Sequence, residues 1–283
     1  MSDFRLGEAI LFCPADRPDR YEKALARADR VILDLEDAVS PAAKARARRC
    51  VIDALPRLGD RVMVRINASA SASAWHDEDL KALRELREQK QVAPWLMLPK
   101  AESPAQLEHL GDFSLVALCE TARGVTNAGA LAASANCVAL FWGGEDLVAD
   151  LGGCRSRDPS GRYYPLIEQA RGSVLLAAAS HGKAAIDAVH IDIADVEGLA
   201  RESREAADLG FRAKACIHPS HVALIREAFR PDEARCRWAE AVLGAMKGAQ
   251  GGVAALDGQM IDEPLFRQAL RILEAAGRSP GCG

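Results

Sequence analysis

The stretch RVILDLED at residues 30–37 indicates the fold, because its pattern of an apolar run followed by charged residues recurs along the chain. Its Val, Ile and Leu side chains predict a buried strand, and the acidic residues that follow end it. Similar apolar runs occur at regular intervals before and after it, so the sequence predicts eight strands. They are Ala9–Cys13, Arg30–Leu35, Val62–Ile66, Trp95–Leu98, Leu115–Cys119, Cys137–Trp142, Ala185–Val189 and Lys214–Ile217.

Longer amphipathic segments rich in Ala, Glu and Arg separate these runs. Strands that alternate with such helices are typical of a parallel sheet with crossover helices, and eight units over about 220 residues predict an α/β protein with a (β/α)₈ TIM barrel. The main predicted helices are Arg17–Ala28, Pro41–Leu55, Asp79–Gln89, Tyr163–Ser180, Val196–Leu209 and Pro219–Phe229. A doubly wound open sheet is the alternative, but no G-x-G-x-x-G follows the first strand.

The C-terminal part differs from this pattern. We expect residues 1–230 to form the catalytic barrel and residues 231–283 to form helices and a lid, packed on the barrel or on a neighbouring subunit. Helices are predicted at Asp232–Lys247 and Pro264–Ala275, and the glycine-rich residues 248–252 lie between them. A flexible joint that carries a terminal helix is typical of a segment that moves.

Composition limits the classes of protein to consider. The chain has 283 residues, 49% of them hydrophobic and 27% charged, with a net charge of -4, which is not the composition of a disordered or strongly cationic protein. No apolar run is long enough to span a bilayer and no signal peptide is evident, so we expect a cytoplasmic protein with no membrane partner. Few aromatic residues and no basic stripe argue against nucleic acid. The eight cysteines form no C-x-x-C pair, and we expect them to be reduced.

Charged side chains stand where the predicted strands end, which in a barrel is the rim that carries catalytic groups. Any single acid there is about equally well explained as a helix cap or first-turn residue. Caps do not explain the arginine and the lysine, because helix N-termini disfavour cations. The residues at the rim are Asp34, Glu36, Asp37, Arg65, Asn67, Lys100, Glu120, Glu145, Asp146 and His218.

Clustered carboxylates repel one another unless a cation holds them, so the sequence indicates a divalent metal ion with Arg65 and Lys100 facing an anionic substrate. Oxygen ligands favour Mg²⁺, with Mn²⁺ as an alternative. His218 and His221 form an i, i+3 pair, which without a third ligand is weak evidence for zinc.

Two further groups of residues fit a ligand at this rim. Gly143 and Gly144 allow backbone amides to approach a ligand closely, although a tight strand-to-helix turn explains them equally well. Arg17 and Lys23 follow the first strand, where they either form a solvated helix face or hold phosphates.

These motifs, in this order, resemble the citrate lyase β-subunit-like family, whose members include malyl-CoA and citramalyl-CoA lyases and, more distantly, HpcH/HpaI aldolases. The similarity runs from about Leu11 to the C-terminus. It is carried by LFCP at 11–14, DLEDAV at 34–39, RIN at 65–67, PK at 99–100, ET at 120–121, GGEDL at 143–147, IHP at 217–219 and GQMID at 258–262. The family fold is a (β/α)₈ barrel, which agrees with the strand pattern.

The resemblance implies roles for individual residues. Glu120 and Asp146 would be the Mg²⁺ ligands, and Arg65 would bind the oxo-acid carboxylate and the carbonyl that becomes an oxyanion. Asp262 would act as acid and base from the lid of an adjacent subunit. Glu36 and Asp37 would be acids that surround the metal ligands. Lys100 would orient Glu36 or a metal-bound water. Arg17 and Lys23 would contact the phosphates of coenzyme A.

The expected activity is reversible cleavage of a hydroxyacyl-CoA such as malyl-, citramalyl- or citryl-CoA by a homotrimer. Two alternatives remain: a class II pyruvate-type aldolase that acts on free hydroxy-oxo acids, and a β subunit of citrate lyase that needs an acyl-carrier partner and other subunits. The chain departs from the family pattern at Ala213, where glycine is usual, and at His221, where glutamine is usual, so the acyl or CoA pocket is expected to differ.

Overall fold

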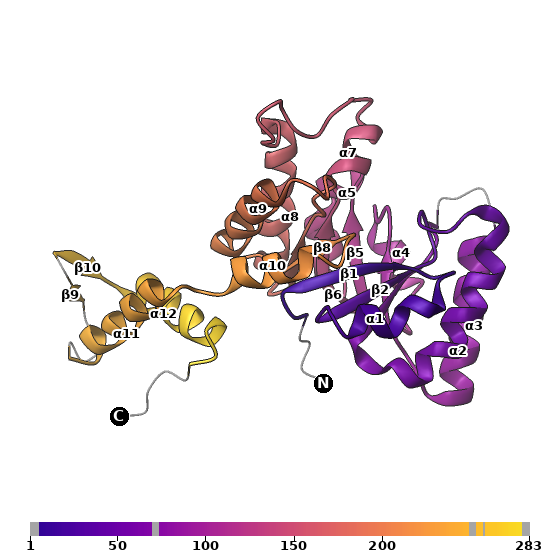
Figure 1. Cartoon of the computed structure of the whole chain (residues 1–283), viewed down its shortest axis with the longest axis horizontal. Coiled ribbons are helices and arrows are strands. Elements are labelled where there is room, and N and C mark those ends of the chain that lie inside the picture. The colour runs from indigo at the N-terminus through magenta and orange to yellow at the C-terminus, as the bar shows by residue number, and fades with distance from the viewer. Residues whose placement is uncertain (1–5, 70–73, 249–252, 257, 279–283) are drawn as a thin grey trace. The chain divides into compact units, whose positions relative to one another are not determined.

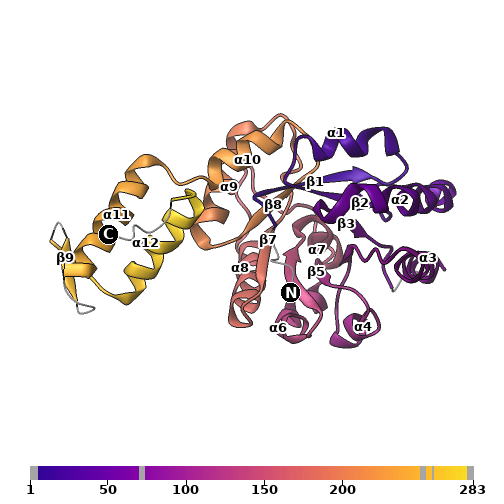
Figure 2. The ribbon, with the colours of Figure 1, turned by 90° about the horizontal axis from the view of Figure 1, so that it is seen from below.

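The computed structural model describes residues 6–69, 74–248, 253–256 and 258–278. They divide into two compact units between Ile225 and Arg226. The first unit is a closed barrel of parallel strands in which each strand pairs with the next along the chain and β8 pairs back to β1 (Figures 1 and 2). The strands are β1 Ala9–Pro14, β2 Arg30–Asp34, β3 Val62–Arg65, β4 Trp95–Leu98, β5 Leu115–Cys119, β6 Cys137–Trp142, β7 Ala184–Asp187 and β8 Ala213–Cys216.

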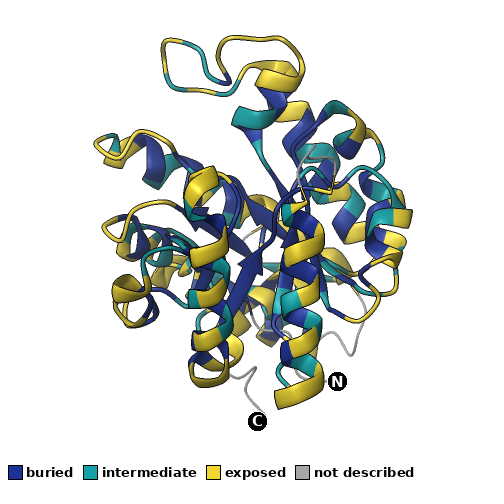
Figure 3. Cartoon of the chain, turned by 90° about the vertical axis from the view of Figure 1, so that its right-hand side faces the viewer, coloured by how far each residue is buried: buried dark blue, intermediate teal, exposed yellow. Residues whose placement is uncertain are grey.

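Helices follow the strands and surround the barrel, with buried inner faces and exposed outer faces (Figures 2 and 3). Local sequence sets their ends: Asp195 caps α9 by accepting from the Gly198 N–H, and Gly210 ends it at φ +107°. The helices are α1 Tyr21–Leu25, α2 Lys44–Leu58, α3 Trp75–Lys90, α4 Pro104–Glu108, α5 Ala122–Thr126, α6 Ala128–Ala133, α7 Gly144–Asp150, α8 Pro165–Ser180, α9 Val196–Leu209 and α10 His221–Phe229, with 3₁₀ turns η1 Pro18–Arg20, η2 Pro41–Ala43 and η3 Gly59–Arg61.

Alternate residues of the strands fill the barrel interior, because successive side chains of a strand point to opposite faces. Ile32, Met63 and Leu118 belong to this buried core. Two residues further along the same strands, the same face carries Asp34, Arg65 and Glu120. The apolar barrel core therefore changes to charged groups at the carboxyl ends of the strands.

The second unit consists of α11 Glu233–Gly248, β9 Ala254–Leu256, β10 Gln259–Ile261 and α12 Glu263–Ala275. Strands β9 and β10 form an antiparallel pair, and apolar side chains of α11 such as Val242 pack with Ile261 and Leu273. Asp262 is the N-cap of α12 and accepts a hydrogen bond from the Leu265 N–H. Of the joint expected at residues 248–252, Gly248 is the last residue of α11, and residues 249–252 lie outside the described residues.

The barrel predicted from the sequence is confirmed, with small shifts of its elements. Strands β7 and β8 each begin one residue earlier than expected, and β7 ends at Asp187 because that residue forms the last pair with Lys214. The helix predicted at 17–28 is a 3₁₀ turn followed by a five-residue helix. No described helix is long and apolar enough to cross a membrane.

Candidate active site

Arg65, at the end of β3, is held by its neighbour on β2. Its Nε and Nη2 donate to the two carboxylate oxygens of Asp34 at 2.7 and 2.6 Å. Asp34 also accepts from the backbone N–H groups of Glu36 and Ala38. Burial alone would lower the pKa of Arg65, but the hydrogen bonds and charge of Asp34 outweigh it and raise the pKa. The guanidinium is therefore a fixed positive charge at the mouth of the barrel.

The third nitrogen of Arg65 faces two other acids that were predicted to lie here. Its Nη1 lies 2.9 Å from Glu36 Oε2 and 3.6 Å from Asp37 Oδ2. The Glu36 side chain is 10% exposed and that of Asp37 is 61% exposed. Glu36 is thus part of the buried cluster, whereas Asp37 stands at its solvent edge.

Lys100 brings together carboxylates from three different strand ends. Its Nζ donates to Glu36 Oε1 at 2.8 Å and lies 3.7 Å from Glu120 Oε1 and 3.6 Å from Asp146 Oδ1. Glu120 follows β5 and Asp146 lies in the first turn of α7, which follows β6. Glu120 and Asp146, 26 positions apart in the sequence, therefore both lie within 4 Å of the same ammonium group.

The backbone around Glu120 has an unusual shape that the sequence accommodates. Lys100 adopts φ +50°, and its N–H donates to Glu120 Oε1 at 3.0 Å. A Cβ at Gly143 would lie 2.9 Å from the Cβ of Glu120 and 3.0 Å from its Oε2, which is too close for any larger residue without movement. A Cβ at Gly144 would lie 3.1 Å from the ring of Trp142, which is a tight contact that a shift of a few tenths of an ångström would relieve. Close packing against Glu120 therefore restricts position 143 more strongly than packing against Trp142 restricts position 144.

Burial and a neighbouring carboxylate both disfavour the charged form of Glu120. Burial raises the pKa of Glu120 to about 8, and the nearby Asp146 carboxylate adds to the effect, while Lys100 and Arg65 only partly offset it. Burial also raises the pKa of Glu36. A divalent cation beside Glu120 and Asp146 would remove this repulsion.

The donor set fits magnesium rather than a fully protein-ligated metal. Within the described residues, no group of three or more His, Cys, Asp or Glu side chains is arranged to hold a metal ion. Mg²⁺ commonly takes one or two carboxylates and completes its octahedron with water and substrate oxygens, which Glu120 and Asp146 would allow. His218 is exposed and His221 buried with its Nε2 3.4 Å from the Ile193 carbonyl oxygen, so neither joins this cluster.

The remaining predicted residues belong to other elements of the structure. Arg17, in the segment after β1, donates from Nε and Nη2 to Asp19, and Lys23 is exposed on α1. Asp262 belongs to the second unit, described above. Of the two departures from the family pattern, Ala213 lies in the barrel core and His221 begins α10.

Sequence reasoning missed Lys44, which holds the backbone at Glu36. The Lys44 ammonium is buried and donates to the carbonyl oxygens of Leu35 and Glu36 and to Asn67 Oδ1. Asn67 in turn donates to Asp79 from both its backbone and its side chain. A lysine in an exposed-looking helix start gives no signal of this role, because only the fold shows that it points inward.

A second set of buried charges lies around β7 and β8. Asp187 accepts from Arg171, Lys214 and the indole N–H of Trp142, and all four side chains are almost fully buried. Arg171 belongs to α8, so the set joins the barrel wall to its helices. It was not predicted, because Asp187 and Lys214 interrupt the short apolar runs of β7 and β8, and nothing in the sequence indicates that they pair.

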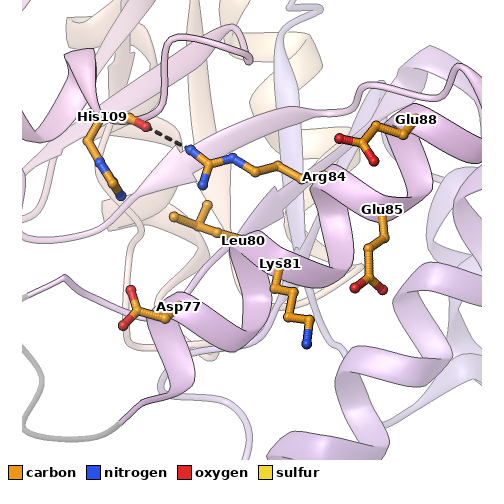
Figure 4. A pocket seen from close by; sticks show the side chains of 7 residues that line it. All are labelled: Asp77, Leu80, Lys81, Arg84, Glu85, Glu88 and His109. Carbon is orange, nitrogen blue, oxygen red and sulfur yellow. Dashed lines mark hydrogen bonds between the residues drawn. The ribbon is translucent and has the colours of Figure 1, made fainter.

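A surface groove of about 390 Å³ is separate from these residues (Figure 4). It is lined by α3 and by His109, and both acids and bases stand along it. Arg84 spans it by donating to the His109 carbonyl oxygen. Its groups are those of an ordinary solvated helix face.

Comparison with known proteins places the chain in a family. The model of the family described as HpcH/HpaI aldolase/citrate lyase matches residues 8–219. The chain belongs to that family. The barrel and the class of enzyme expected from the sequence, a lyase of the aldolase/citrate lyase family, are thereby confirmed.

Individual members of the HpcH/HpaI aldolase/citrate lyase family are similar over nearly the whole chain. A citrate lyase subunit beta-like protein of Mycobacterium tuberculosis is 45% identical, over 96% of this chain and 97% of that protein. The mitochondrial citramalyl-CoA lyase of Rattus norvegicus is 33% identical, over 95% of this chain and 85% of that protein. A similar solved structure is the crystal structure of CitE from Mycobacterium tuberculosis in complex with magnesium, acetoacetate and coenzyme A. Its TM-score is 0.87 at 44% sequence identity, over 96% of this chain and 98% of that chain.

Proposed function

We propose that this chain is a Mg²⁺-dependent lyase that cleaves, or in reverse forms, the carbon-carbon bond of a hydroxyacyl-CoA such as malyl-, citramalyl- or citryl-CoA. One observation carries the proposal: Glu120 and Asp146 both face Lys100 Nζ, in the cluster that Glu36 joins to the fixed guanidinium of Arg65. The magnesium, acetoacetate and coenzyme A bound to the solved relative support the same chemistry.

Glu120 and Asp146 hold the metal ion in this proposal. When bound, Mg²⁺ acts as a Lewis acid on the α-hydroxy or α-oxo acid part of the substrate. Arg65 binds the carboxylate of that part and, through Nη1, places positive charge where the oxyanion develops. Asp34 keeps the guanidinium in that orientation, so it needs no reorganisation during the reaction.

Proton transfer is assigned to Asp262. Its Oδ1 caps α12, which leaves Oδ2 to accept the substrate hydroxyl proton as the carbon-carbon bond breaks and the enolate of the acyl-CoA forms. In the direction of condensation the same carboxylate takes the α-proton of the acyl-CoA. We propose that Asp262 serves the barrel of an adjacent subunit in a homotrimer.

Arg17 and Lys23 are the proposed contacts for the phosphates of coenzyme A. Arg17 lies between β1 and η1, and Lys23 lies in α1, which follows. The Arg17 side chain is 43% exposed. Within the described residues its hydrogen bonds go to Asp19, which is itself exposed. A phosphate can therefore compete for Arg17 without disturbing the buried cluster.

The test is turnover by the purified chain of malyl-, citramalyl- and citryl-CoA, with and without Mg²⁺. Cleavage that stops with EDTA and returns with Mg²⁺ is expected, and full activity in EDTA would contradict the proposal. Cleavage of free 4-hydroxy-2-oxo acids but not of the CoA esters would favour the class II aldolase. Turnover only after addition of an acyl-carrier protein and a transferase would favour a citrate lyase subunit.

A further inference from the structure

Asp146 lies in a helix whose beginning needs support from elsewhere. It is in the first turn of α7, and the residue before that helix is Gly143, which has no side chain to cap it. A misplacement of α7 would move the Asp146 carboxylate away from Glu120. The neighbouring residue, Glu145, supplies the support.

The Glu145 side chain is held by hydrogen bonds from two residues that follow α7. Its Oε1 accepts hydrogen bonds from Ser156 Oγ at 2.7 Å and from Arg157 Nη1 at 2.8 Å. Successive side chains of a helix point roughly 100° apart, so Glu145 can be tied back while Asp146 faces Lys100. The contact between Glu145 and Arg157 therefore joins the first turn of α7 to Arg157.

Arg157 is in turn anchored to a different part of the barrel. Its Nε and Nη2 donate to the two oxygens of Glu202 at 2.8 and 3.2 Å, and Nη2 also donates to the Tyr163 hydroxyl at 2.5 Å. The guanidinium lies 4.1 Å from the centre of the Tyr163 ring. Every nitrogen of a side chain that is only 11% exposed has a partner.

Glu202 makes this anchor rigid. It belongs to α9, and its side chain is 3% exposed, 3.5 Å from Lys214 Nζ and 3.1 Å from His190 Nδ1. Lys214 is fully buried in β8 and also binds Asp187. The chain of contacts thus runs from the barrel wall through Glu202 and Arg157 to the helix that carries Asp146.

We propose that Arg157 is a positioning residue, which through Glu145 sets the orientation of Asp146 for metal binding. The inference rests on the Mg²⁺ site proposed above and adds a residue that acts on it from outside. Arginine suits this role because its planar guanidinium binds two carboxylates in different directions, whereas the single ammonium of lysine cannot reproduce that geometry.

The experiment measures metal affinity of the full chain, by calorimetry with Mg²⁺ and by electron paramagnetic resonance with Mn²⁺. Arg157→Lys and Glu145→Gln are each expected to weaken binding by about tenfold. Because both variants break the same contact, the double variant is expected to lose little more than either alone. Val51→Ala is the matched control: it opens a cavity at a fully buried position of α2 and should leave the affinity unchanged.

Asp146→Asn, measured in the same titration, separates the two proposals. Loss of binding in Asp146→Asn together with wild-type affinity in Arg157→Lys and Glu145→Gln would overturn the positioning role and leave the metal site standing. Wild-type affinity in Asp146→Asn would overturn both. An equal loss in Val51→Ala and Arg157→Lys would attribute the effect to general destabilisation and would also overturn the positioning role.

Discussion

Asp34 and Arg65 are paired both along the sheet and through their side chains: they are register partners on β2 and β3, and both oxygens of Asp34 accept from the guanidinium. This two-point contact fixes the plane of the guanidinium and leaves Nη1 directed toward Glu36 and Asp37. The strand pairing therefore fixes the orientation of the guanidinium that, in the proposed reaction, places positive charge where the oxyanion develops.

Asp34→Asn should destabilise the protein strongly, because it leaves the buried charge of Arg65 without its main partner. We expect the free energy of unfolding to fall by about 3–5 kcal/mol. Asp112→Asn is the control. The Asp112 side chain is 49% exposed and pairs with Arg84 and Arg87, so its ion pairs should contribute less than about 1 kcal/mol to the free energy of unfolding. Urea denaturation of the three proteins measures both values, and equal losses would contradict the role of Asp34.

Magnesium should stabilise the wild-type chain but not variants of its proposed ligands. At a free Mg²⁺ concentration 100 times the dissociation constant, binding adds about 2.7 kcal/mol to the free energy of unfolding. Glu120→Gln and Asp146→Asn should show no such gain in thermal denaturation, and their turnover should fall by several orders of magnitude. Glu78→Gln, on the exposed start of α3, should behave as wild type. Stabilisation of Glu120→Gln by Mg²⁺ to the same extent as wild type would show that Glu120 is not a metal ligand.

The barrel and much of the rim could be predicted from the sequence because both depend on local patterns. A buried parallel strand is a short apolar run, and its last residues must lie at the rim, so Arg65, Lys100, Glu120 and Asp146 were found from position alone. The same reasoning placed Glu36 within the cluster, where Lys100 and Arg65 contact it.

The supporting residues could not be predicted, because they depend on contacts between distant segments. Lys44 lies in a helix start that appears solvent-exposed in sequence, yet it is buried under Glu36. Arg157 and Glu202 are 45 positions apart, and nothing in either local pattern indicates that they meet. The position of Asp262 relative to the barrel stays a prediction for the same reason.

Acid should weaken the buried network around Glu202. Burial alone would raise the pKa of Glu202, but hydrogen bonds from His190 and Arg157 and the charge of Lys214 outweigh it and hold the pKa well below its usual value. A lowered pKa in the folded state stabilises the protein above the unfolded-state value of about 4.3, and this stability is lost as the pH falls below it.

Glu202→Gln should therefore be less stable than wild type at pH 7, with a difference that shrinks toward pH 3. Urea denaturation across that range measures it. Glu205→Gln is the control on the same helix, because the Glu205 side chain is 43% exposed and lies 3.9 Å from Arg171. A difference between Glu202→Gln and wild type that is constant from pH 7 to pH 3 would contradict the assigned charge.

Removal of the positive charges after β1 should affect binding of the CoA ester more than its cleavage. Arg17→Ala and Lys23→Ala are each expected to raise KM several-fold with kcat nearly unchanged, since phosphate contacts act equally on the ground state and the transition state. Added salt should narrow the difference from wild type, because these side chains are exposed. Lys81→Ala, in the surface groove of Figure 4, is the control and should keep its KM.

Asp262 can be tested for action across a subunit boundary by mixing two inactive variants. Asp262→Asn keeps the helix cap, because asparagine caps helices as well as aspartate, but it cannot accept the substrate proton. Asp146→Asn keeps Asp262 and loses the metal ligand. If Asp262 serves a neighbour, mixed oligomers combine an intact barrel with an intact lid at some of their sites.

With random assembly of equal amounts, half of the barrels are intact and half of their neighbours carry Asp262, so about a quarter of the wild-type activity should return. The measurement is turnover after the two variants are unfolded together and refolded, compared with each variant treated alone. Activity that stays at the level of the separate variants, while wild type refolds fully, would place Asp262 in its own subunit's site or outside the reaction. Recovery would show that the active site is completed by a second copy of the chain.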